Sequence, residues 1–183
     1  MDKATGLLAE ARFCESPNHD ARPDGAEPSM IVVHGISLPP GQFGGGEIEA
    51  LFSNTLDWDA HPYFDEIRGL EVSAHLLIRR DGSIIQFVPF GQRAWHAGES
   101  CFRGQSRCND FAIGIELEGE DETPYDDRQY PVLQGVIRAL CEAYPRVSPR
   151  EVAGHCDIAP GRKTDPGTAF DWLRLYDGLQ PTN

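Results

Sequence analysis

The sequence has no long apolar run. Its first residues, MDKATGLLAEARF, have no extended apolar core behind a basic start, so we expect no secretory signal. No stretch approaches the roughly 20 apolar residues of a transmembrane helix. The five cysteines are an odd number and form no C-x-x-C pair, which favours reduced thiols over a disulfide framework. Together these absences predict a cytoplasmic protein.

Positive charge is also scarce. The chain has 16 Lys and Arg against 29 Asp and Glu, which gives a formal net charge of −13. A nucleic-acid binder needs cations to neutralise phosphates, and an anionic membrane surface would repel this chain for the same reason. We therefore expect neither nucleic acid nor membrane as a partner. An anionic small substrate would need a local cationic patch.

The rest of the composition is that of one globular domain. A length of 183 residues suits a single domain over residues 1–183, and no internal repeat is present. Residues 1–28 are rich in Pro, Asp and Asn and are predicted to be an irregular lead-in.

Hydrophobic patterning predicts strands and helices in alternation. Residues 111–117 alternate with a period of two, which is typical of a strand with two distinct faces. Further strands are expected at 30–34, 72–79, 84–88 and 152–155, and helices at 48–52, at 132–140 and from about 170. Asp81-Gly82 indicates a hairpin turn, and residues 91–109 read as a long loop. The expected fold is α+β, a single domain with a central mixed β-sheet flanked by helices.

Two of the six histidines stand at the ends of short apolar segments. His34 precedes a glycine and His155 follows one, and each taken alone is more often a structural residue than a ligand. Asp165 lies ten residues after His155, and Pro166 restricts its backbone. Two histidines and one carboxylate make a catalytic zinc set that leaves a fourth position for water. The spacing alone does not establish the set, because His34 is distant in sequence.

Two further residues could take part in hydrolysis. Glu116 lies between Gly114 and Glu118 on the less bulky face of its strand, where a carboxylate could move a proton. Lys163 could stabilise an oxyanion. An isolated residue of either kind is more often a solvated surface group.

Five segments, taken together, resemble the zinc-dependent peptidoglycan amidases, a family that also includes peptidoglycan recognition proteins. They run in order across nearly the whole chain: VVHGISLPPGQFGGG, HPYFDEIRGLEVSAHLLIRRDG, RAWHAG, RCNDFAIGIELEG and GHCDIAPGRKTDPGTAFDW. The resemblance implies one Zn²⁺ per chain, held by His34, His155 and Asp165. It also implies that Glu116 is the catalytic carboxylate and that Lys163 supports the transition state.

The same resemblance implies the substrate. It would be a small anhydro-muropeptide returning from the cell wall for recycling, cut between the lactyl group of 1,6-anhydro-N-acetylmuramic acid and L-alanine by a monomeric enzyme. Arg107 would bind the peptide part. The residues that match the wall of the substrate cleft are Trp95, His96 and Ala97. Arg107, Arg103 and Lys163 would offset the negative field locally.

Two positions depart from the family pattern as the resemblance gives it. The family usually has Asn after the first histidine, where this chain has Gly35, a residue we still expect beside bound substrate. Close relatives often carry Arg before VSAH, where this chain has Glu71. Both changes bear on substrate affinity and preference, since neither replaces a ligand or catalytic group.

Three alternatives remain open from the sequence. The chain could be a non-catalytic peptidoglycan-binding module, although all the ligand and catalytic positions are present. It could be an amidase that acts on intact peptidoglycan. It could also be a thiol enzyme that uses Cys156, which would need an activating environment that one dipeptide does not reveal.

Overall fold

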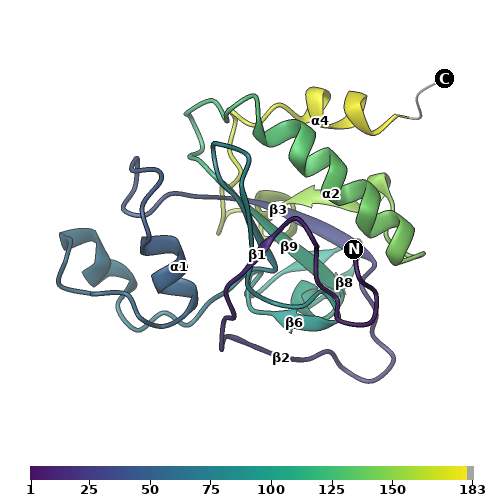
Figure 1. The fold of residues 1–183 in the computed structure, drawn as a ribbon, viewed down its shortest axis with the longest axis horizontal. Helices are drawn as coiled ribbons and strands as arrows, with labels where there is room; N and C mark the ends of the chain where they lie inside the picture. The colour runs from purple at the N-terminus through teal and green to yellow at the C-terminus, as the bar shows by residue number, and fades with distance from the viewer. Residues whose placement is uncertain (181–183) are drawn as a thin grey trace.

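The computed structural model describes residues 1–180, which form a six-stranded mixed sheet with helices around it (Figure 1). The strand order is β1-β5-β4-β9-β3-β10. The strands are β1 (Arg12–Phe13), β3 (Met30–Ile36), β4 (Leu76–Ile78), β5 (Ile84–Gln86), β9 (Ala112–Glu118) and β10 (Val152–Gly154). Strands β4, β9, β3 and β10 run parallel, and β5 is antiparallel to β4. The predicted α+β class and mixed sheet are confirmed.

The two longest helices, α2 (Gln129–Ala143) and α4 (Trp172–Leu179), cover one face of the sheet, and the shorter α1 (Glu47–Phe52) and α3 (His155–Ile158) pack against the other. There are 3-10 turns at η1 (Pro62–Ile67), η2 (Cys108–Asp110) and η3 (Pro149–Glu151). Leu133, Ile137 and Leu140 of α2 are buried at helical spacing, and α4 lies beside α2 on the same side (Figure 1). Among the described residues, no helix is long and apolar enough to cross a membrane.

The two faces of the central strands have different neighbours. Val33 and Ile115 belong to the core that α2 covers. Val32 and Ala112 point to the opposite face and pack in a smaller cluster with Ile158. Because side chains alternate along a strand, His34 of β3 and Glu116 of β9 continue this second face toward the strand ends. Those residues form the site described below.

The first 28 residues are less irregular than the sequence predicts. They contribute β1 and β2 (His19–Ala21), and β2 pairs with β6 (Gln92–Ala94). The predicted loop 91–109 also contains the two-residue strands β7 (Cys101–Phe102) and β8 (Gln105–Ser106). Strands of two or three residues are too short to leave a periodic signal, and the β2–β6 pairing joins distant parts of the chain.

A partly buried arginine anchors the lead-in. The Arg22 guanidinium donates to the backbone carbonyl oxygens of Phe90, Asn109, Asp110 and Ala112, at 3.0 to 3.2 Å. Burial lowers the pKa of Arg22 to about 10, so the side chain stays protonated at neutral pH. Carbonyl dipoles thus solvate a charge that has left water.

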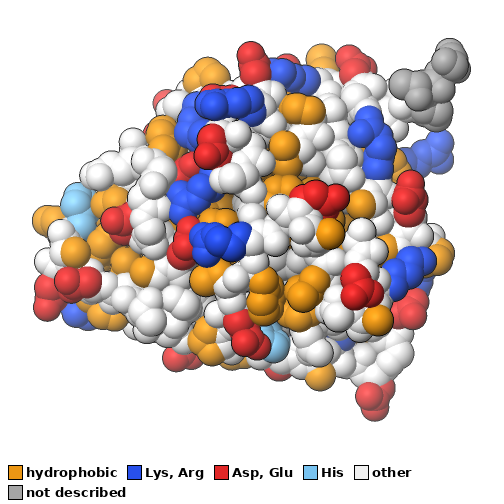
Figure 2. All heavy atoms as spheres, in the orientation of Figure 1, with side chains coloured by type: hydrophobic (Ala, Val, Ile, Leu, Met, Phe, Trp, Pro, Cys, Tyr) orange, Lys and Arg blue, Asp and Glu red, His pale blue; other side chains and the backbone are white. Residues whose placement is uncertain are grey.

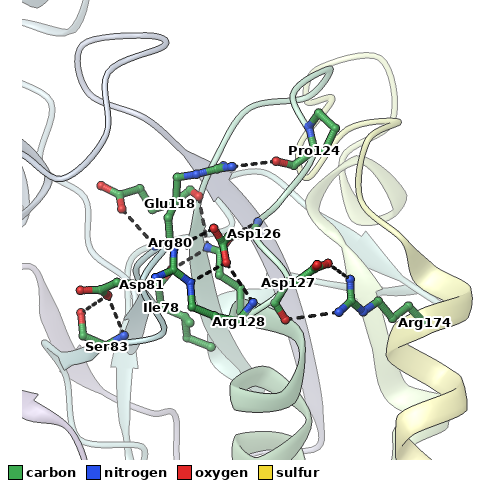
Figure 3. A network of polar contacts seen from close by, with 11 residues as sticks. Ile78, Arg80, Asp81, Ser83, Glu118, Pro124, Asp126, Asp127, Arg128 and Arg174 are labelled. Atoms are coloured by element: carbon green, nitrogen blue, oxygen red, sulfur yellow. Dashed lines mark hydrogen bonds and ion pairs between the residues drawn. The ribbon is translucent and has the colours of Figure 1, made fainter.

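Figure 3 shows the polar contacts that hold the segment before α2. Arg80 donates through its backbone N–H to Glu118 at 3.1 Å and through its guanidinium to the carbonyl oxygen of Pro124 at 2.9 Å. Arg128 pairs with Asp126 at 2.7 Å. The Arg80–Pro124 hydrogen bond ties this segment to the chain that follows β4. On the face shown in Figure 2, acidic and basic side chains are interspersed despite the net negative charge.

Candidate active site and metal-binding residues

Three elements bring the predicted ligand residues together. His34 lies near the end of β3, and His155 is the first residue of α3, directly after β10. Since β10 pairs in parallel with β3, with Gly154 opposite Val33, the two histidines reach the same edge of the sheet. Asp165 follows in the next loop, and its carbonyl oxygen accepts a hydrogen bond from the Cys156 N–H at 2.9 Å. That bond ties the loop back to α3.

The three side chains converge on one point. His34 Nδ1 lies 3.0 Å from His155 Nδ1 and 3.2 Å from Asp165 Oδ2. His155 Nδ1 lies 3.1 Å from the same oxygen. Donor atoms bound to one zinc ion at tetrahedral angles would be about 3.3 Å apart, given bonds of about 2.0–2.1 Å. The donor set therefore has the chemistry and the spacing to hold a metal ion.

The charges at this point also suit a metal site. Burial lowers the pKa of His34 to about 4, so its ring is neutral at pH 7. Burial raises the pKa of Asp165, but the hydrogen bonds with His155 and His34 outweigh that effect and hold the pKa well below its usual range. A neutral imidazole and an ionised carboxylate are the forms that bind metals.

Glu116 lies beside His34 on the neighbouring strand. In the parallel register of β3 and β9 the two residues are direct partners, so their side chains share one face. Glu116 is buried, and its Oε2 has no hydrogen-bond partner among the described residues. Burial raises the pKa of its carboxyl well above the usual range, the charge of Asp165 raises it further, and Lys163 opposes both. This carboxylate is placed to exchange protons.

Glu118, on the same face, has a different environment. It receives a hydrogen bond from the backbone of Gly44 and pairs with Arg79 at 3.1 Å. Both of its oxygens accept hydrogen bonds from the protein, whereas Oε2 of Glu116 accepts none within residues 1–180. The structure thus separates two glutamates that the sequence pattern places on one face.

A cleft of about 740 Å³ opens above the donor set. Its lining includes His34, Glu116, His155, Lys163 and Asp165. One further wall is apolar and includes Leu38, Phe52, Tyr63, Ile67 and Leu70; another is formed by Glu120, Asp121, Glu122 and Thr123. Sequence reasoning singled out neither wall, because the residues come from separate loops and no local pattern links them.

Only some of the predicted substrate-binding residues line this cleft. His96 and Gly35 line the cleft, whereas Trp95, Ala97 and Arg107 are outside the described lining. Arg107 is 71% exposed and pairs with Asp110 at 3.2 Å.

The structure also gives the exposure and the neighbours of Ala97 and Glu71. Ala97 is fully buried, and its carbonyl oxygen is 3.2 Å from His155 Nε2. Glu71 is exposed and follows the cleft-lining Leu70.

Cys156 does not have the surroundings of a nucleophile. Burial raises the pKa of its thiol, and the charges of Asp157 and Asp165 raise it further. A catalytic cysteine needs the opposite shift, because the thiolate is the reactive form. The thiol mechanism therefore has no structural support.

Known proteins share this sequence and fold. The family described as N-acetylmuramoyl-L-alanine amidase matches residues 24–168. The chain is 60% identical to the 1,6-anhydro-N-acetylmuramyl-L-alanine amidase AmpD of Escherichia coli, over 93% of this chain and 92% of that one. A crystal structure of a selenomethionine AmpD derivative superimposes with a TM-score of 0.93 at 57% identity, covering 96% of this chain and 98% of that one.

A more distant structure was solved with a bound substrate. The Escherichia coli N-acetylmuramyl-L-alanine amidase AmiD, in complex with the substrate anhydro-N-acetylmuramic acid-L-Ala-D-γ-Glu-L-Lys, matches with a TM-score of 0.59 at 28% identity. The match covers 86% of this chain and 60% of that one.

Proposed function

Because the chain belongs to the N-acetylmuramoyl-L-alanine amidase family, we propose that it hydrolyses anhydro-muropeptides during cell-wall recycling. The bond cut is the amide between the lactyl group of 1,6-anhydro-N-acetylmuramic acid and L-alanine. The observation that carries this proposal is the convergence of His34, His155 and Asp165 in the lining of one cleft. Glu116 lies beside them, and its Oε2 has no hydrogen-bond partner in the described part of the chain. The highly similar relatives support the choice of substrate.

The proposed cofactor is one zinc ion, held by His34 Nδ1, His155 Nδ1 and one Asp165 oxygen. Two nitrogens and one carboxylate oxygen, all within 3.2 Å of one another, suit zinc and leave room for a fourth ligand. When bound, zinc would supply an acidified water nucleophile and polarise the scissile carbonyl.

The protein's own groups would manage protons and charge. Glu116 would accept the proton of the attacking water through its free oxygen and deliver it to the leaving amine of L-alanine. Burial raises the pKa of this carboxyl, which makes its carboxylate a stronger base than that of an exposed glutamate. Lys163, in the cleft lining, would stabilise the negative charge that develops on the carbonyl oxygen.

Other residues would bind the substrate away from the scissile amide. Arg107 would attract the carboxylates of the peptide, helped by Arg103 and Lys163. His96 and the backbone of Gly35 line the cleft, and Trp95 and Ala97 belong to the adjoining segment. A local cationic patch is needed because the chain as a whole carries −13.

The decisive experiment measures release of free peptide from purified anhydro-muropeptide. The protein is assayed as prepared, after chelator treatment, and after zinc is returned. We expect activity that is lost with chelation and restored by zinc. Binding of the muropeptide without cleavage, in zinc-loaded protein, would instead identify a non-catalytic binding module.

A parallel assay on intact sacculi addresses the remaining alternative. Preferential cleavage of sacculi would overturn the proposed substrate and indicate an amidase of the intact wall. We further propose that the protein acts in the cytoplasm as a single-domain monomer. In support, all five cysteines are free thiols, as expected in a reducing compartment.

A further inference from the structure

The second ring nitrogen of each histidine ligand also has a defined neighbour. His34 Nε2 lies 3.0 Å from His96 Nδ1, and both side chains are buried. His155 Nε2 lies 3.2 Å from the carbonyl oxygen of Ala97. The consecutive residues His96 and Ala97 therefore contact the two histidine ligands through the ring nitrogens that face away from the donor set.

The direction of these hydrogen bonds follows from ligation. A ring nitrogen that binds a metal offers its lone pair, so in a neutral imidazole the other nitrogen carries the hydrogen. With Nδ1 of both ligands turned to the metal point, each Nε2–H must donate. His96 Nδ1 and the Ala97 carbonyl oxygen are then the acceptors. His96 must carry its own hydrogen on Nε2, the atom that has no partner among the described residues.

The sequence makes room for this arrangement. A Cβ at Gly114 would lie 2.4 Å from Cγ of the His96 ring, so a larger residue at position 114 would displace the ring. Gly114 lies two residues before Glu116 on the same face of β9, and Val32, two before His34, is its partner on β3. The ring of His96 thus packs on the sheet directly behind the donor set.

A third residue fixes the segment in place. The Asn109 Oδ1 accepts hydrogen bonds from the backbone N–H groups of both His96 and Ala97, at 3.1 and 2.8 Å. Arg162 also donates to the Ala97 carbonyl oxygen, at 2.6 Å. These contacts restrict the position of both acceptors.

We propose that His96 and Ala97 are positioning residues that orient both histidine ligands, and that the Asn109 side chain holds them in register. This inference rests on the metal site of the proposed function. It gives His96 a role behind His34 in addition to its place in the cleft wall. It also makes Asn109 a determinant of metal affinity, although it touches no ligand.

The test is zinc affinity, measured by competition with a chelator of known strength. His96→Leu removes the acceptor, whereas His96→Asn keeps an oxygen close to the position of Nδ1. Loss of such an outer contact is expected to weaken zinc binding about 10- to 100-fold, so His96→Leu should fall in that range. His96→Asn should stay within about threefold of wild type, because its oxygen can still accept the hydrogen bond. Thermal unfolding of the metal-free proteins serves as the control for general damage.

A second pair decides the question if His96→Leu does not fold. Asn109→Leu removes the acceptor for both backbone N–H groups, and Asn109→Asp keeps it. We expect weakened zinc binding in the first and near wild-type binding in the second. Wild-type zinc affinity in His96→Leu or in Asn109→Leu, or equal losses within either pair, would overturn the inference.

The outcome is separable from that of the proposed function. Wild-type protein that binds zinc but leaves anhydro-muropeptide intact would refute the proposed reaction and leave the positioning role standing. Zinc-dependent cleavage by the wild-type protein, together with unchanged zinc affinity in these variants, would support the proposed reaction and refute the positioning role.

Discussion

The hydroxyl group of Tyr125 donates a 2.9 Å hydrogen bond to the carbonyl oxygen of Pro166, the residue that follows the ligand Asp165. Tyr125 belongs to the segment before α2, on the face of the sheet opposite His34 and Glu116. Its ring passes close to Gly35, where a Cβ would lie 2.1 Å from the hydroxyl oxygen. Gly35 therefore leaves space for a contact that supports the ligand loop.

We expect Tyr125→Phe to destabilise the protein. The change leaves the buried Pro166 carbonyl oxygen without its partner, at a cost of about 1–3 kcal/mol in the free energy of unfolding. Urea unfolding of the metal-free protein measures this loss. Tyr63→Phe is the matched control, because no hydrogen bond of the Tyr63 hydroxyl is found within residues 1–180. Equal stability of the two variants would contradict the prediction.

Two glycine-to-alanine changes should have opposite signs. Gly35→Ala would force the Tyr125 hydroxyl aside and lower stability by about 1–3 kcal/mol. Gly135 occupies an exposed position of α2, and no atom lies within 4 Å of the Cβ that Gly135→Ala would add. It should raise stability by up to about 1 kcal/mol, since alanine favours helix over glycine. Thermal or urea unfolding checks both; the same sign for both would refute the steric account of Gly35.

Glu116→Gln should remove activity without removing the metal. The amide cannot accept a proton, and loss of general acid–base catalysis typically lowers kcat by about 10²- to 10⁴-fold. Zinc content measured on the purified variant should equal that of wild type, because Glu116 is not among the three donor residues. Retention of full activity would exclude this carboxylate from the reaction.

Arg107→Asn should raise KM more than it lowers kcat. The proposed role is binding of the substrate peptide, and loss of one charge-assisted contact at an exposed site is expected to raise KM about 10-fold. Asparagine is chosen because Arg107 has a left-handed backbone, with φ of 64°, that asparagine tolerates. Arg107→Lys keeps the charge and is the control. A fall in kcat at unchanged KM would place Arg107 in the chemical step instead.

The pair of Asp20 and Arg93 should contribute pH-dependent stability. The hydrogen bonds from Arg93 lower the pKa of Asp20 in the folded protein. A carboxyl whose pKa is lowered on folding adds stability above its unfolded pKa of about 3.9, and this stability is lost as the pH falls through the folded value. Asp20→Asn should therefore cost about 0.5–1 kcal/mol at pH 7, a small effect because the pair is partly exposed.

Unfolding measurements at several pH values test this prediction. The difference between wild type and Asp20→Asn should shrink steadily below pH 4. A difference that does not change between pH 7 and pH 2 would show that the contribution is not ionic.

Much of the fold could be predicted from local pattern. The period-two alternation of residues 111–117 gave a two-faced strand, observed as Ala112–Glu118, and helical spacing at 132–140 gave the core of α2. Asp81-Gly82 gave the turn between β4 and β5. The pairing of β2 with β6 left no such signal, because it joins segments more than 70 residues apart. The strands β7 and β8 pair locally, but two residues each are too few to leave a periodic pattern.

The sequence by itself determined which residue types could perform the chemistry: two histidines at strand ends, a restrained aspartate and a glutamate on a sparsely filled face. Their assembly was decided by the tertiary structure alone. His34 and His155 are 121 positions apart, and the parallel pairing of β3 with β10 brings their Nδ1 atoms to 3.0 Å from each other. Hydrogen bonding then separates the two buried glutamates, because both oxygens of Glu118 accept bonds from the protein and Oε2 of Glu116 has no partner within residues 1–180. Register and desolvation are properties of the whole fold, and no local spacing encodes them.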